Sequence, residues 1–148
     1  MTIAVLSLVG ILIALYLTLY KIGVIGDLSC TLGSCETLNT SKWATFLGLP
    51  VAAWGLGAYL ALFTLSLIGT SDRHAGSQTI SLLLVAIAAW SVIFSAWLTY
   101  LELFVIHAIC IWCVTSAVLL VVILAVAVLD MRRTKGAGHA LGEALEQR

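Results

Sequence analysis

Charged side chains are scarce in this sequence. Of its 148 residues, 9 % are charged and 62 % are hydrophobic, whereas a soluble domain carries roughly 25 % charged residues. So few charges cannot cover a surface that faces water, and the composition argues against a soluble protein. The formal net charge is zero and no basic cluster is interleaved with aromatic residues, so we expect no nucleic-acid partner.

The charges are missing from four long stretches of the chain. These stretches are residues 2–20, 43–71, 75–101 and 103–129. A helix needs about 20 apolar residues to cross a bilayer, and a charge at mid-membrane costs roughly 2.5–3.5 kcal/mol. We therefore predict an all-α membrane protein that lies in the lipid bilayer as a bundle of four transmembrane helices. The predicted spans are residues 2–21, 50–69, 79–101 and 107–129.

The first hydrophobic stretch has the features of a retained anchor. No Lys or Arg precedes it, and the residues after it, Tyr20 to Gly23, do not form the small-residue site at which signal peptides are cut. We expect one transmembrane domain over residues 1–131. The remaining residues, 132–148, form a short tail that is too small for a second folded domain.

The basic residues predict the orientation of the bundle. Four spans place the N-terminus, the 70–78 connection and the C-terminus on one side of the membrane. That side carries Arg73, Arg132, Arg133, Lys135 and Arg148, and the other carries Lys21 and Lys42. By the positive-inside rule the first side is cytoplasmic. We expect a multi-pass protein of the inner (plasma) membrane whose 22–49 loop and 102–107 turn face outward.

The outer loop, residues 22–49, is the longest connection. Thr40 or Ser41 is suited to cap a short helix over residues 42–47 that lies on the membrane surface. Gly48 would end that helix, and Pro50 suits the first helical position of the second span.

All four cysteines lie at the predicted outer surface. Cys30 and Cys35 are in the long loop, and Cys110 and Cys113 form a CxxC motif where the fourth span begins. An even number of cysteines in an oxidising compartment points to disulfides. Residues three apart share a helix face, and the first turn of a helix stabilises a thiolate, the attacking species in disulfide exchange. Such a pair is suited to relay electrons from the water side to a lipid-soluble acceptor.

Two other interpretations of the cysteines stay open. The two pairs could be static disulfides that staple the bundle, or the four thiolates could hold zinc. The spacing of five between the loop cysteines is looser than in most zinc knuckles, and we expect no metal. Two nearby polar residues are also ambiguous. His107 either tunes Cys110 or marks the membrane interface, and Glu102 either pairs with His107 or marks the end of a helix.

Aromatic residues gather toward the outer ends of the predicted spans. They are Tyr16, Tyr20, Trp97, Tyr100, Phe104 and Trp112. An aromatic belt at the membrane interface accounts for such a cluster, and a planar quinone ring would also stack on it.

These features resemble the vitamin K epoxide reductase family, in its bacterial disulfide-forming branch, over about residues 5–130. The resemblance is carried by Cys30 and Cys35, by Ser41 six residues after Cys35, by Gly48-Leu49-Pro50, and by the CxxC motif that begins at Cys110. It implies a quinone-dependent thiol-disulfide oxidoreductase. The serine at position 41 is implied to hydrogen-bond a carbonyl of the bound quinone, with Asn39 and Trp112 as further candidates for quinone binding.

The resemblance also implies an electron path. A reduced thioredoxin-like partner would attack a Cys30–Cys35 disulfide, and Cys35 would then attack Cys110 of a Cys110–Cys113 disulfide. The released Cys113 thiolate would reduce a membrane quinone, menaquinone or ubiquinone. Many bacterial relatives carry a fused thioredoxin-like domain that is missing here, so the partner would act in trans. The alternative within the family is a vitamin K quinone or epoxide reductase for which the thiols are only the electron source.

Overall fold

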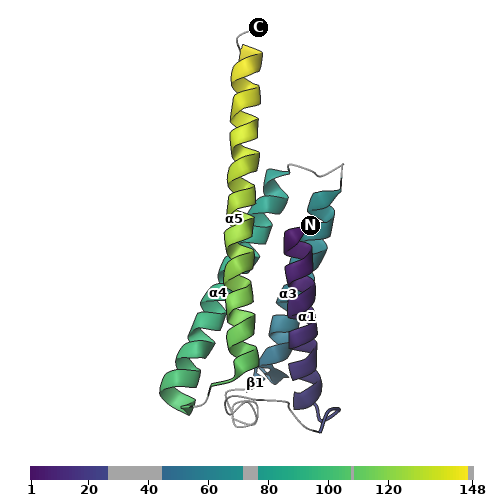
Figure 1. Cartoon of the computed structure of the whole chain (residues 1–148), viewed down its shortest axis with the longest axis vertical. Helices are drawn as coiled ribbons and strands as arrows, with labels where there is room; N and C mark the ends of the chain where they lie inside the picture. Colours follow the sequence, from purple (N-terminus) through teal and green to yellow (C-terminus); the bar gives the residue numbers. More distant parts are fainter. Residues whose placement is uncertain (27–44, 72–76, 108, 147–148) are drawn as a thin grey trace.

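The computed structural model describes residues 1–26, 45–71, 77–107 and 109–146, with side chains up to residue 133. Its long helices are α1 (Thr2–Lys21), α3 (Val51–Thr70), α4 (Gln78–Leu101) and α5 (Ile111–Glu146). They run alongside one another as one bundle (Figure 1). Four helical segments are long and apolar enough to cross a membrane, which confirms the predicted four-span all-α membrane fold. These crossings are Thr2–Lys21, Val51–Thr70, Gln78–Ile106 and Ile111–Arg133.

The bundle core is made of aliphatic and small side chains, together with one tyrosine, that the helices turn toward one another. It comprises Ile3, Ala14, Tyr59, Leu62, Leu84, Ala88, Leu120, Ile123 and Ala127. Small residues let helix backbones approach closely, which is the usual basis of helix packing in lipid. Leu12, Ile93 and Val118 are exposed on the outside of the bundle, where lipid tails are a suitable solvent for them.

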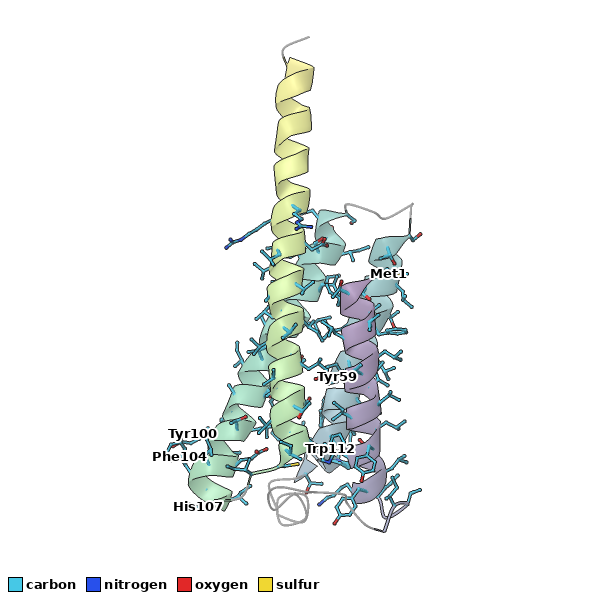
Figure 2. The ribbon with its side chains drawn as sticks, viewed as in Figure 1. Met1, Tyr59, Tyr100, Phe104, His107 and Trp112 are labelled. Carbon is cyan, nitrogen blue, oxygen red and sulfur yellow. The ribbon has the colours of Figure 1, made fainter. Side chains whose placement is uncertain are left out.

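One contact joins three of the helices at mid-height. Tyr59 of α3 is 1 % exposed, and its hydroxyl lies 2.8 Å from the Ser116 hydroxyl and 3.1 Å from the Ser116 carbonyl oxygen of α5. Gly10 of α1 leaves room for the tyrosine ring, because a Cβ atom at this position would overlap it. Figure 2 shows Tyr59 between the helices.

The predicted surface helix over residues 42–47 is wrong in its described part. Thr45–Phe46 forms strand β1, which pairs antiparallel with strand β2 (Leu49–Pro50). Leu47 and Gly48 connect the strands with φ values of 53° and 80°. Two consecutive residues with positive φ make a tight hairpin turn, so the glycine closes a hairpin instead of ending a helix. Residues 42–44 lie outside the described part.

Pro50 lies one position earlier than predicted. Its ψ of 136° is extended, and it is the cap that precedes Val51, the first residue of α3. The ring still fixes a φ of −56°, which suits the entry to a helix.

The prediction of a turn over residues 102–107 is also wrong, whereas its location on the outer side stays a prediction. Glu102–Ile106 continues α4 as a short π-helical segment, η2, which His107 ends with a left-handed φ of 56°. The third span therefore runs further than expected, to Ile106, and the fourth begins later, at Ile111. No Gly or Pro lies between residues 78 and 106 to stop the helix earlier.

The predicted tail is helical as far as the structure describes it. α5 continues without a break from the membrane span to Glu146. In Figure 1 its C-terminal part stands clear of the other helices, at the end of the bundle opposite the β1–β2 hairpin.

Candidate functional site

The CxxC motif occupies the start of α5. Cys110 is the residue before the helix, and its carbonyl oxygen accepts the first helical hydrogen bond, from Val114 N at 3.0 Å. Cys113 is the third helical residue. Both carry free thiols, Cys110 fully buried and Cys113 half-buried. The helix start therefore presents its unpaired N–H groups to the sulfur of Cys110.

The Cys110 sulfur accepts hydrogen bonds from these groups, as the side chain of a helix N-cap does. The Cys113 thiol donates a hydrogen bond to the Cys110 sulfur, and the backbone N–H groups of Cys113 and Trp112 donate to it as well. The Cys113 thiol has the largest effect, and together these donors outweigh burial and lower the pKa of the Cys110 thiol to about 7 from an ordinary 9.0. Cys110 is thus the sulfur of the pair that carries a thiolate near neutral pH.

Glu102 approaches the same pair from the end of α4. Its side chain is 4 % exposed. The carboxyl accepts hydrogen bonds from the Cys113 thiol and from the Cys110 backbone N–H. Of the two open interpretations of Glu102, its position agrees with the end of a helix, because it is the residue that follows α4; its carboxyl also contacts the cysteines.

A large apolar cavity lies beside the thiol pair. Its volume is about 840 Å³, which falls in the range of small-molecule sites, roughly 300–1,000 Å³. Cys113 is part of its wall, whereas Cys110 is not. Aromatic rings from α3 and α4 make up much of the lining. They are Trp54, Tyr59, Trp90, Phe94 and Trp97.

The polar groups on the cavity wall are few and come from different helices. Cys113 and Ser116 lie on α5, Tyr59 lies on α3, and Glu102 follows α4. Three further hydroxyl residues of the wall lie on α4, and they are Ser91, Ser95 and Thr99. Apolar walls with a few polar groups are typical of sites that bind flat organic molecules. This lining fits a quinone, because aromatic faces stack on a planar ring and hydroxyl groups bond its carbonyl oxygens.

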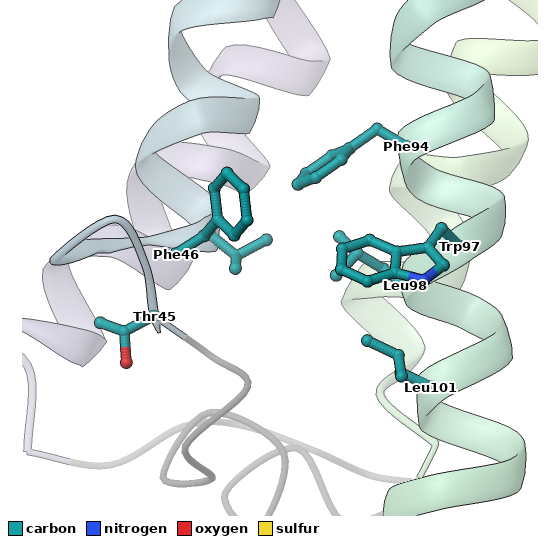
Figure 3. A pocket seen from close by; sticks show the side chains of 7 residues that line it. Thr45, Phe46, Phe94, Trp97, Leu98 and Leu101 are labelled. Carbon is teal, nitrogen blue, oxygen red and sulfur yellow. The ribbon is translucent and has the colours of Figure 1, made fainter.

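The β1–β2 hairpin closes one end of the cavity. A smaller pocket of about 340 Å³ lies there, and Phe46 of β1 faces Phe94 and Trp97 of α4 across it (Figure 3). The rings of Phe46 and Phe94 are 6.2 Å apart. On α3, the Trp54 indole N–H donates to the Phe46 carbonyl oxygen at 3.2 Å, which fixes the hairpin to the helix.

The side of the cavity is open toward the outside of the bundle. Trp90 belongs to its lining and is nevertheless 72 % exposed. A residue with both properties lies at a rim, so the cavity reaches the lipid-facing surface of α4. A lipid-soluble molecule therefore has a route to Cys113 from within the membrane.

The structure describes only some of the predicted site residues. It brings Cys110 and Cys113 together, whereas Cys30, Cys35, Asn39 and Ser41 lie outside the described residues.

Trp112 packs against Tyr16 of α1, with ring centroids 5.5 Å apart, and is not part of the cavity wall. Figure 2 shows it at the same end of the bundle as His107. His107 is exposed. In the predicted aromatic cluster, Tyr100 and Phe104 stack on each other at 4.8 Å, and both are exposed.

Sequence reasoning missed the cavity residues Trp54, Tyr59, Trp90 and Phe94. They lie within charge-free spans, where an aromatic residue has no distinguishing signal in the sequence. Glu102 had one signal, since it is the only acidic residue between positions 73 and 129. A lone carboxyl at the edge of a span is a functional candidate by default.

A comparison with protein families identifies the family of the chain. The model of the vitamin K epoxide reductase family matches residues 1–128, a range that contains all four cysteines and nearly all of the membrane-spanning sequence. The chain therefore belongs to the vitamin K epoxide reductase family and is a membrane oxidoreductase of this quinone-linked family.

Proposed function

We propose that the chain is a thiol:quinone oxidoreductase that supports disulfide formation outside the cytoplasm, as in the bacterial branch of the family. One observation carries the proposal. The Cys113 thiol contacts the Cys110 sulfur and also belongs to the wall of the apolar cavity. Electrons that reach Cys110 from the water side therefore need to move only between neighbouring sulfurs to meet a lipid-soluble acceptor.

In this proposal, electrons enter at the loop pair, Cys30 and Cys35. A thioredoxin-like partner in trans would reduce the Cys30–Cys35 disulfide, and Cys35 would attack Cys110. The position of the CxxC motif supports this order. The segment that carries the loop cysteines joins α1 to β1, and both the end of α1 and β1 lie at the same end of the bundle as the start of α5 (Figure 1).

The acceptor is a membrane quinone, menaquinone or ubiquinone. When bound, it takes up two electrons and two protons. The described residues that would hold it are the aromatic rings of Trp54, Trp90 and Phe94, with Tyr59 and Ser116 as polar partners on the wall. Ser41, Asn39 and Trp112 remain the candidates given by the family resemblance and the aromatic cluster.

The orientation is proposed from the basic residues. Five of the seven Lys and Arg residues lie on the side of the two termini and the α3–α4 connection, which favours a cytoplasmic location for that side. The CxxC motif then faces outward from an inner (plasma) membrane, where thiol oxidation is useful to secreted proteins.

Gly57 offers a test of the cavity. It belongs to the wall, and a Cβ atom added there meets no other atom within 4 Å. Gly57→Phe should therefore fill open space without disturbing the helices. We expect quinone reduction to fall by roughly tenfold or more, in keeping with the penalty for mismatched volume in a pocket, while dithiothreitol still opens the Cys110–Cys113 disulfide.

The matched control is Leu60→Phe on the same helix. Leu60 is exposed and is not a wall residue, so quinone reduction should be unchanged. If folded Gly57→Phe protein reduces quinone as fast as the unmodified chain, the acceptor does not bind in this cavity.

A further inference from the structure

Glu102 is the one carboxyl that the described residues bring to the thiol pair. It is almost fully buried, at 4 % exposed, and it contacts Cys113 through the thiol and Cys110 through the backbone N–H. It also lies on the wall of the cavity. Among the described residues no ion pair includes Glu102, so its polar contacts are those with the two cysteines.

These contacts treat the two sulfurs differently. The carboxyl accepts a hydrogen bond from the Cys113 thiol, whereas its contact with Cys110 is made through the peptide N–H and not through sulfur. A carboxylate in contact with a sulfur favours the neutral thiol over a second negative charge. At Cys110 the Cys113 thiol and the N–H groups at the helix start outweigh the charge of the carboxylate, which also raises the pKa of the Cys110 thiol but is the smallest of the effects there.

We propose that Glu102 holds the one proton of the reduced CxxC pair on Cys113, leaves the thiolate on Cys110, and accepts that proton when the disulfide forms. The inference rests on the proposed function, because it assigns the proton path of the same reaction. Glu102 would be a catalytic residue, since it touches a reacting sulfur atom.

The step balances in atoms and charge. In the reduced pair, Cys110 is a thiolate and Cys113 a thiol. Formation of the Cys110–Cys113 bond releases two electrons and the Cys113 proton. The electrons pass to the quinone, which the proposed function supplies as oxidant, and Glu102 takes the proton and passes it on. A second proton from water completes the hydroquinone. When a thiolate later attacks Cys110 and reduces the disulfide, the departing Cys113 sulfur takes up a proton that reaches it from water by way of Glu102.

Few other titratable groups surround the carboxyl in the described part of the chain. At the start of α5 these are Cys110, the residue before the helix, and Cys113. Tyr59 of α3 lies elsewhere on the same cavity wall, and exposed His107 follows η2. A change in the ionisation of the pair on substitution of Glu102 is therefore best attributed to this carboxyl.

The test measures where the reduced pair carries its thiolate, without quinone or partner. Reduced protein in detergent is treated briefly with iodoacetamide at neutral pH, and the adducts on Cys110 and Cys113 are counted by fragment mass spectrometry. With Glu102→Gln, which keeps the size of the side chain and an oxygen for the Cys110 N–H, the ratio of Cys113 to Cys110 adducts should rise by roughly tenfold or more. A unit charge in contact with a thiol changes its ionisation by at least about that factor.

Asp130→Asn is the matched control, because Asp130 is an exposed carboxyl at the other end of the α5 span. It should leave the ratio unchanged. Glu102→Asp moves the carboxylate away from Cys113 by one methylene, so it should raise the ratio of Cys113 to Cys110 adducts by less than Glu102→Gln does. This variant provides the test if Glu102→Gln does not fold. An unchanged ratio in a folded Glu102 variant overturns the proposal.

The labelling experiment distinguishes failure of the Glu102 assignment from failure of the proposed function. If the ratio responds to Glu102 but no variant or unmodified protein reduces quinone, the proton assignment stands as chemistry of the thiol pair and the quinone role fails. If quinone is reduced normally while the ratio is unaffected by Glu102→Gln, only the assignment of Glu102 fails.

Discussion

Cys110 and Cys113 are identical side chains three residues apart, and their surroundings make them chemically different. Cys110 is fully buried at the helix start, where backbone N–H groups and the Cys113 thiol point at its sulfur. Cys113 faces the cavity and Glu102. One sulfur is therefore prepared to exchange with another thiol, and the other is placed beside the apolar site. This division of roles follows from a single helical turn.

The ionisation of Cys110 gives a prediction at this scale. The pKa of its thiol is lowered to about 7, so its thiolate should be half-formed near that pH and should disappear as the pH falls below it. The pH dependence of iodoacetamide labelling at Cys110, read by mass spectrometry, measures this midpoint. Cys113→Ala removes the strongest hydrogen-bond donor, and the midpoint should rise toward the ordinary 9.0.

A control with serine at position 113 distinguishes the effect of the lost hydrogen bond on the Cys110 midpoint from the effect of lost packing. Cys113→Ser keeps a donor beside the Cys110 sulfur, and the midpoint should stay closer to that of the unmodified chain than in the alanine variant. Equal midpoints in the alanine variant and the unmodified chain would mean that Cys113 does not stabilise the Cys110 thiolate.

At the scale of helices, one side chain of the cavity wall, Tyr59, also joins α3 to its neighbours α5 and α1. Tyr59 bridges α3 to Ser116 of α5, and α1 accommodates the tyrosine ring at Gly10. The same tyrosine belongs to the wall of the cavity. The contact that packs the helices is therefore also part of the wall of the site.

Gly10→Ala tests this contact. The added methyl would overlap the Tyr59 ring, and overpacking of this kind costs about 1–3 kcal/mol. We expect a lower unfolding temperature in detergent, followed by circular dichroism. In the control Gly57→Ala the added methyl meets no other atom within 4 Å, and removing a helical glycine should stabilise by about 0.5–1 kcal/mol. Equal unfolding temperatures for Gly10→Ala and the unmodified chain would contradict the close packing of Tyr59 on α1.

At the scale of the whole molecule, hydrophobic length alone predicted the four spans and the bundle. This is possible because the need for about 20 uncharged residues per crossing is a property of composition. The CxxC motif predicted where the reactive pair would lie relative to α5, since the first turn of a helix has a defined geometry. Contacts between elements were not predictable in this way. Burial of Glu102 depends on how α4 approaches α5, and the aromatic cavity wall depends on which faces of α3 and α4 oppose each other.

The errors have local causes. Residues 102–106 were predicted to be a turn because a single charge was taken as the end of a span, whereas the helix continues through it as η2. The hairpin was missed because Leu47 adopts a left-handed φ that a leucine rarely takes. Both segments border the site, where local preferences most often give way to tertiary contacts.

The relay between the two cysteine pairs is the central claim, and Cys113→Ala tests it most directly. Without the Cys113 thiol, a bond between Cys35 and Cys110 cannot be resolved. In Cys113→Ala protein that holds the Cys30–Cys35 disulfide, the Cys110 thiolate can attack Cys35 and displace the Cys30 thiol, so the Cys35–Cys110 disulfide should accumulate before any donor is added, identified by non-reducing mass mapping. When a reduced thioredoxin-like donor and quinone are supplied, quinone reduction should stop. Continued quinone reduction by Cys113→Ala, or reduction that stops with no such disulfide, would contradict the account.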